Sequence, residues 1–200
     1  MKISNTDRII LGIDPGTAVT GYGLIQLLDN KLSLLSVGVM ELGDLDWDQP
    51  MKLKRILERV LGLIEEFHPD ELAIEAPFYG RNVQVMLKLG RAQGVVIAAA
   101  VMKGIAVVEY APKKVKKALT GNGNASKEQV ARMVERMLPE LLKQATPLKL
   151  DATDALAVAL CHYLQQNPFN QALTKENKKV KVNKSNSWKS FVSANPNRVK

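Results

Sequence analysis

The chain has one cysteine and two histidines among its 200 residues. Its single thiol, Cys161, cannot close an internal disulfide, and so few Cys and His residues cannot supply the ligands of a structural zinc site. No apolar run is long and charge-free enough to span a bilayer. The first seven residues also lack the apolar core of a secretory signal. We therefore expect a cytoplasmic protein that is not held in a membrane.

Positive charge is in excess only near the end of the chain. The formal net charge is +8, yet residues 171–200 hold eight Lys/Arg and one Asp/Glu, while residues 1–170 hold twenty and nineteen. The basic character therefore does not by itself predict that the folded part binds nucleic acid. We predict a folded domain over residues 1–167 and a disordered basic tail over 168–200, whose charge can add sequence-independent affinity for nucleic acid.

The hydrophobic pattern predicts a mixed α/β fold. Glycines inside the second predicted strand, Gly21 and Gly23, indicate a bulge or a close backbone approach. We predict one mixed five-stranded sheet flanked by helices on both faces. The predicted strands are 8–14, 19–28, 31–41, 71–76 and 105–110, and the predicted helices are 51–67, 83–102, 126–144 and one from 151.

The predicted helix over residues 83–102 is apolar on every side in its second half, residues 94–101. Such a helix must be buried on more than one side. One side can lie on the sheet and the other against a second copy of the chain, which predicts a homodimer. The alternative is a monomer that encloses the helix fully.

Four acidic residues occur at strand ends, within an apolar strand or at a helix start, where their positions indicate either a structural or a functional role. Asp14 ends the apolar run of the first strand before Pro15 and Gly16, although Asp before Pro-Gly is also an ordinary turn starter. Glu75 lies within an apolar strand, where a carboxylate needs a partner or a cation. Asp151 and Asp154, three residues apart, share one side of a helix start, but helix capping also explains them.

These acids come together if the first and fourth strands are neighbours. Clustered carboxylates must be protonated or neutralised. Oxygen ligands and a phosphate-bearing substrate suit Mg²⁺, with Mn²⁺ as a substitute, and two ions about 4 Å apart could clamp a phosphodiester. We therefore predict a site for one or two Mg²⁺ ions.

Basic and aromatic residues occur near the predicted strand ends. The loop after the fourth strand carries Phe78, Tyr79 and Arg81, and exposed aromatic rings can stack on splayed bases. Lysines follow the fifth strand closely. They form a phosphate-binding patch only if they border the acids, and are otherwise a solvated helix face. These lysines are Lys113, Lys114, Lys116 and Lys117.

Four motifs taken in order, Gly12–Thr17, Ala73–Glu75, Leu87–Gly90 and Asp151–Ala157, resemble those of the RuvC family of Holliday junction resolvases. The resemblance extends from about residue 8 to about residue 166. It implies an RNase H-like fold, a homodimer, and Mg²⁺-dependent paired nicking of four-way junction DNA in strands of like polarity. The implied products carry 5′-phosphate and 3′-OH ends. It also implies partnership with the RuvA–RuvB branch-migration complex, within DNA recombination and repair.

The resemblance also assigns roles by position. Phe78 lies where the family has an aromatic residue that stacks at the junction crossover, with Tyr79 as the neighbouring alternative. Lys116 and Lys127 match basic DNA-contacting positions. Some members carry His where this chain has Asp151. The family's metal-binding acids match Asp14, Glu75, Asp151 and Asp154.

Three other functions compete with this one. An actin-like or hexokinase-like ATPase shares the Asp-x-Gly-Thr loop, but such proteins repeat the fold in two lobes and this chain has room for one. A related nuclease could act on RNA. A module could recognise junction shape without cutting, although binding DNA gains nothing from clustered anions.

Overall fold

The computed structural model describes residues 7–29, 31–43, 48–77, 82–143 and 148–166. The chain divides into a unit of residues 1–164 and a unit of residues 165–200. The first unit contains the whole sheet and its helices, apart from the last two residues of the final helix. Of the second unit the structure describes only residues 165 and 166, so the predicted tail lies outside the described residues.

Five strands form one mixed sheet in the order β3-β2-β1-β4-β5. The first three pair antiparallel as a meander, whereas β4 pairs parallel with β1 and β5 pairs parallel with β4. The predicted mixed sheet is thus confirmed, and the first and fourth strands are neighbours. The strands are β1 (Arg8–Asp14), β2 (Val19–Leu28), β3 (Lys31–Glu41), β4 (Glu71–Glu75) and β5 (Ala106–Tyr110).

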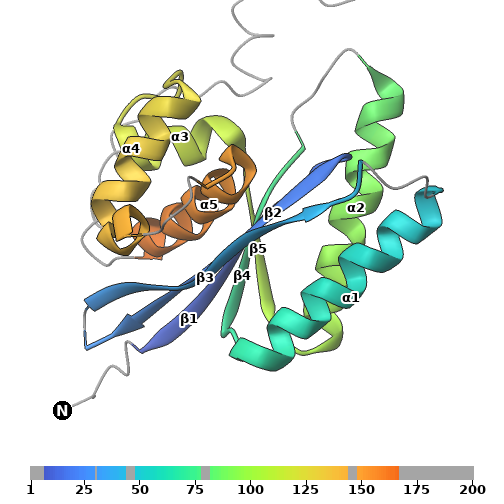
Figure 1. The fold of residues 1–200 in the computed structure, drawn as a ribbon, viewed down its shortest axis with the longest axis horizontal. Coiled ribbons are helices and arrows are strands. Elements are labelled where there is room, and N and C mark those ends of the chain that lie inside the picture. The colour runs from blue at the N-terminus through green and yellow to red at the C-terminus, as the bar shows by residue number, and fades with distance from the viewer. Residues whose placement is uncertain (1–6, 30, 44–47, 78–81, 144–147, 167–200) are drawn as a thin grey trace, which may run out of the picture. The chain divides into compact units, whose positions relative to one another are not determined.

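Helices cover both faces of the sheet, as predicted (Figure 1). One core lies under α1 and α2, and a second lies under α3, α4 and α5. Both cores are apolar, because alternate residues of the central strands point to opposite faces. The helices are α1 (Gln49–Phe67), α2 (Val83–Met102), α3 (Pro112–Thr120), α4 (Lys127–Met137) and α5 (Leu150–Gln166), with a 3₁₀ turn over Pro139–Lys143.

Local sequence signals decide where these helices begin and end. α4 begins with a capping box, in which Ser126 N–H donates to the Gln129 side chain at 2.9 Å and Gln129 N–H donates to Ser126 Oγ at 3.3 Å. The prediction that this helix continues to about residue 144 is wrong. α4 ends at Met137, because Pro139 has no N–H to donate and clashes with the preceding turn.

The apolar helix α2 differs from what the sequence predicted in two ways. It has the length and composition of a helix that crosses a membrane, so the expectation that no run is long and apolar enough is wrong. Its buried side, which includes Val96 and Ala99, packs in the core with α1. Its other side is open in the single chain, where Val101 is 61% and Met102 80% exposed. Full enclosure within a monomer is therefore wrong as well.

α5 approaches the sheet very closely, and glycines make this possible. A Cβ atom on Gly21 would collide with the carbonyl oxygen of Asp151, and one on Gly12 would collide with that of Ala155. The close backbone approach indicated by the strand glycines is confirmed. The first two turns of α5 consequently rest directly on the backbone of β1 and β2.

We expect Gly21→Ala to destabilise the protein by about 1–3 kcal/mol, because the added methyl group forces α5 away from β2. Gly62→Ala in α1 is the matched control, since nothing lies within 4 Å of its new Cβ atom. The free energy of unfolding of that control should rise by about 0.5–1 kcal/mol, because Ala has a higher helix propensity than Gly. Urea denaturation of both variants measures the difference, and equal stabilities would contradict the close approach.

Candidate active site

Asp14 and Glu75 lie side by side at the carboxyl ends of the parallel strands β1 and β4. β1 and β4 pair with Ile13 opposite Ile74, so Asp14 and Glu75 follow at the next position of each strand. Both carboxylates line one pocket of about 430 Å³ that is open to solvent. They also line an adjoining pocket together with Leu89 of α2. The strand pairing thus places these two acids without help from any loop.

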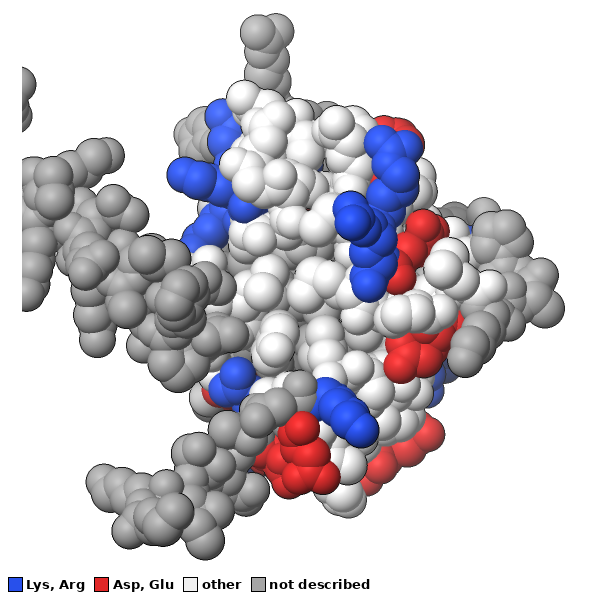
Figure 2. Space-filling model, turned by 90° about the vertical axis from the view of Figure 1, so that its left-hand side faces the viewer, with Lys and Arg blue, Asp and Glu red and all other residues white. Residues whose placement is uncertain are grey.

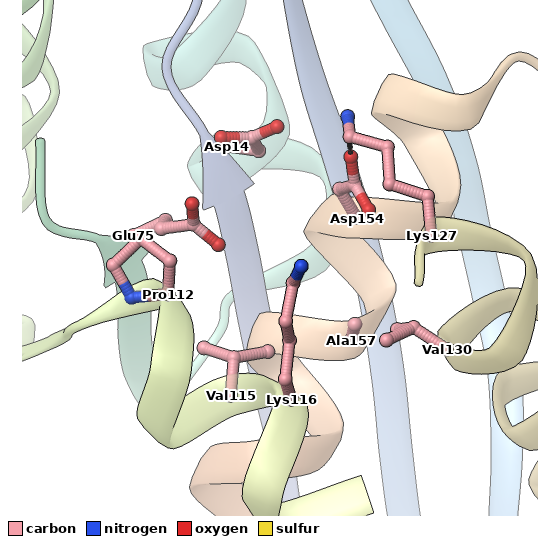
Figure 3. A pocket seen from close by; sticks show the side chains of 9 residues that line it. All are labelled: Asp14, Glu75, Pro112, Val115, Lys116, Lys127, Val130, Asp154 and Ala157. Carbon is pink, nitrogen blue, oxygen red and sulfur yellow. Dashed lines mark hydrogen bonds and ion pairs between the residues drawn. The ribbon is translucent and has the colours of Figure 1, made fainter. Parts of the chain in front are cut away.

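The third acid comes from α5. Asp14 pairs across the sheet with Gly21, and the start of α5 lies on that glycine. Asp154 therefore faces the first pocket from the helix side (Figure 3). Asp151 stands one turn earlier and does not line either pocket, but its charge contributes to raising the pKa of Asp14. Three of the four predicted acids are brought to one pocket.

Two lysines reach into the same pocket from different helices. Lys116 comes from α3, and Lys127 comes from the start of α4 (Figure 3). Lys127 Nζ donates to Asp154 Oδ2 at 2.5 Å. A cation in the first turn of a helix is opposed by the helix dipole. The ion pair with Asp154 offsets that cost, and the same bond raises the pKa of Lys127.

Burial and mutual repulsion make the pocket acids hard to ionise. Burial, followed by the charge of Asp154, raises the pKa of Asp14 from 3.8 to about 6. Burial, followed by the charges of Asp14 and Asp154, raises the pKa of Glu75 from 4.5 to about 8. Nearby Lys127 opposes both shifts without cancelling them. The site is therefore short of positive charge.

The chemistry of the pocket fits a hard divalent cation. Its acidic ligands are carboxylates from three elements, and no Cys or His is among the residues that line it. As their side chains stand, no three Asp, Glu, His or Cys residues in the described part of the chain are gathered tightly enough to hold a metal ion. Lys127 instead supplies positive charge to Asp154. Asp14, Glu75 and Asp154 are the residues that could hold such an ion, with Asp151 one turn away.

The other predicted DNA-contacting residues lie apart from this pocket or outside the described residues. Lys113, Lys114 and Lys117 are exposed on α3 and do not line it. On the face that carries α3 and α4, basic side chains form separate groups rather than one continuous patch (Figure 2). Residues not described by the structure include Phe78, Tyr79 and Arg81.

A buried polar pair on β5 and α5 was not identified from the sequence. Tyr110 and His162 are buried and hydrogen-bonded to each other at 2.8 Å. A polar residue within the otherwise apolar run of α5 was the available signal for His162. The pairing itself joins residues 52 positions apart, so no local pattern could reveal it.

Comparisons with known proteins agree with this geometry. A family model described as crossover junction endodeoxyribonuclease RuvC matches residues 10–162. The chain is 54% identical over 194 residues to the protein of that name from Cytophaga hutchinsonii, covering 97% of this chain and 89% of that one. It is 49% identical over 199 residues to the one from Porphyromonas gingivalis, covering 99% and 100%.

Solved structures show the same likeness. Thermus thermophilus RuvC in complex with Holliday junction substrate matches with a TM-score of 0.73 and 35% identity, over 82% of this chain and 97% of that chain. The yeast mitochondrial Holliday junction resolvase matches with a TM-score of 0.60 at 16% identity, over 84% and 85%. The second likeness shows the fold alone.

The raised pKa of Glu75 predicts how stability depends on pH without divalent cations. Glu75 ionises near 4.5 when unfolded and near 8 when folded, so the folded state binds more protons between these values. Its contribution to stability therefore falls as the pH rises from about 4.5 to about 8. Glu75→Gln does not titrate, and should be about 1–3 kcal/mol more stable than the parent at pH 8.5 and no more stable at pH 4.5.

Chemical denaturation in EDTA at both pH values measures this difference. Glu58→Gln, which removes an exposed carboxylate of α1, is the control for the loss of one negative charge outside the pocket. If the offset of Glu75→Gln from the parent is the same at both pH values, Glu75 is not held in a charge-poor environment.

Proposed function

The chain belongs to the RuvC family of crossover junction endodeoxyribonucleases, and we propose that it resolves four-way DNA junctions by Mg²⁺-dependent hydrolysis of phosphodiester bonds. The family resemblance read from the sequence motifs is confirmed, and the enzyme is a nuclease. One observation carries the proposal for this chain's own residues. Three carboxylates from β1, β4 and α5 face one pocket with two lysines.

In this proposal Asp14, Glu75, Asp151 and Asp154 hold one or two Mg²⁺ ions. The bound ions would supply Lewis-acid stabilisation of the phosphoryl charge and lower the pKa of water. One of the carboxylates accepts the proton of the attacking water. The products are 5′-phosphate and 3′-OH ends, and no covalent enzyme intermediate is needed.

Lys116 and Lys127 would neutralise negative charge on the DNA phosphates. Lys127 is held by Asp154 in this structure, and it can turn to a DNA phosphate when that carboxylate binds a cation. Lys116 lines the same pocket from α3 (Figure 3). Two ammonium groups placed here would neutralise the scissile phosphate and hold it against the acids.

We further propose that two copies act together on two strands of like polarity. α2 exposes a stripe of small and apolar residues, along which a second helix can approach closely. Nothing lies within 4 Å of a Cβ atom built on either glycine of the stripe. The stripe consists of Leu87, Gly90, Gly94, Ala98 and Val101.

Recognition of the junction and of partners completes the proposal. Phe78 or Tyr79 would stack on a base at the crossover, and Arg81 would contact a phosphate. The exposed lysines of α3 would bind the flanking arms through phosphate contacts. The RuvA–RuvB branch-migration complex is the proposed protein partner.

We expect Asp14→Asn to slow nicking of a synthetic four-way junction in Mg²⁺ by about 100-fold or more, since a neutral amide is a poor ligand for the cation. Junction affinity should persist, because removing a negative charge does not weaken phosphate attraction. Gel assays of nicking and of binding separate the two effects. Glu58→Gln on α1 is the matched control and should cut at the parental rate.

The same assay separates the rival functions. Linear duplex, RNA and ATP without DNA are incubated beside the junction. Preferential cutting of RNA, or ATP turnover without DNA, would overturn the junction-resolving function. Full nicking by Asp14→Asn would overturn the role of the pocket acids.

We expect Gly94→Glu to convert the protein to monomers, because a charged side chain would fill the exposed stripe of α2. Gly62→Glu in α1 is the control, since its new side chain also meets open space but lies off the stripe. Analytical ultracentrifugation measures both variants. A dimer that survives Gly94→Glu would exclude the stripe as the dimer contact.

A further inference from the structure

A chain of polar side chains connects α5 to the sheet. Tyr110 is 3% exposed and His162 is 1% exposed. The Tyr110 hydroxyl lies 2.8 Å from His162 Nδ1, and His162 Nε2 lies 3.2 Å from Glu71 Oε2. Arg8 in turn lies 3.8 Å from Glu71. The chain of contacts therefore joins β1, β4 and β5 to α5.

The direction of these hydrogen bonds follows from protonation. Burial lowers the pKa of His162, so the ring is neutral near pH 7 and carries one N–H. The Glu71 carboxylate lies 3.2 Å from Nε2 and favours the proton on that nitrogen, which leaves Nδ1 as an acceptor. The pKa of Tyr110 is raised to about 12, chiefly by burial, so its hydroxyl keeps its proton. Tyr110 therefore donates to His162.

Tyr110 has contacts with three of the elements that line the pocket, namely β4, α3 and α5. In the β4–β5 register it lies opposite Glu75 itself, and its carbonyl accepts the N–H of Ala76 at 2.9 Å. α3 begins two residues later, and Lys114 Nζ lies 4.8 Å from the centroid of the Tyr110 ring. Through His162 the same side chain reaches α5, two turns beyond Asp154.

The rest of the contact between α5 and the sheet has little direction. Apolar and small residues of α5, such as Ala155, Leu156 and Ala159, rest on glycines of the central strands. Such packing holds the helix close to the sheet, and the glycines limit where it can sit, but it includes no directional bond. A hydrogen bond between buried groups adds a directional constraint on the position of the helix along its axis.

We propose that Tyr110 and His162 are positioning residues that hold α5 in register with β4 and β5, and so set the separation of Asp154 from Glu75. Under the proposed nuclease function, this separation determines how well the acids bind their cation. Misplacement of a catalytic group by about 1 Å can lower a rate about 100-fold.

Tyr110→Phe tests this with the removal of one hydroxyl. We expect Mg²⁺ affinity and kcat for junction nicking each to fall about 10-fold, as for other groups that orient metal ligands. The junction Kd should change less than about twofold, because no DNA-contacting charge is removed. Calorimetric titration with Mg²⁺ alone, single-turnover nicking and junction binding provide the three readouts.

His162 variants separate positioning from simple core stability. His162→Asn keeps an acceptor near Nδ1 for Tyr110, whereas His162→Leu removes it, so the Asn variant should retain more Mg²⁺ affinity and more activity. Val60→Ala, in the core on the other face of the sheet, is the stability control. It should lower the melting temperature while leaving Mg²⁺ affinity and kcat within about twofold of the parent.

A double variant tests whether the two residues act through one bond. Tyr110→Phe combined with His162→Leu should be no worse than His162→Leu alone. Parental Mg²⁺ affinity and kcat in Tyr110→Phe, or losses no larger than those of Val60→Ala, would overturn the positioning role. If the parent protein itself fails to nick junctions, the proposed function falls, and Mg²⁺ titration of the same variants still decides the positioning role.

Discussion

The closeness of α5 to the sheet is the constraint on which the active-site pocket depends. Helices normally keep their distance from a sheet because Cβ atoms on both intervene. Here Gly12 and Gly21 remove those atoms where α5 begins, and its backbone rests directly on β1 and β2. A helix held at ordinary distance would leave Asp154 remote from Asp14 and Glu75. The absence of side chains at Gly12 and Gly21 thus determines where Asp154 lies relative to Asp14 and Glu75.

Close packing also creates the electrostatic problem that the site must solve. Carboxylates brought together in a partly buried place raise one another's pKa, as the values for Asp14 and Glu75 show. Lys127 relieves part of this through its bond to Asp154. A divalent cation would relieve it further, and a phosphate would then find positive charge in the same place. Folding therefore stores unfavourable repulsion that ligand binding can remove.

The two faces of the sheet carry different kinds of side chains. The face under α3, α4 and α5 carries the acids, the pocket lysines and the buried polar chain that includes Tyr110. The face under α1 and α2 carries a mainly apolar core, and α2 leaves an apolar stripe open on its outer side. The chemistry proposed for one face and the self-association proposed for the other are thus on opposite sides of the sheet.

The sequence by itself determined the five strands, four of the five α-helices and the identity of the acids, whereas α3 (Pro112–Thr120) was not predicted. Periods of two and 3.6 residues, turn residues and the Ser126–Gln129 capping box are local signals, and a carboxylate in an apolar strand is conspicuous without a structure. Strand order, the parallel pairing of β1 with β4, the bond between Lys127 and Asp154 and the pairing of Tyr110 with His162 needed the tertiary structure. Each of these joins residues far apart along the chain, so their separation depends on packing that no local pattern encodes.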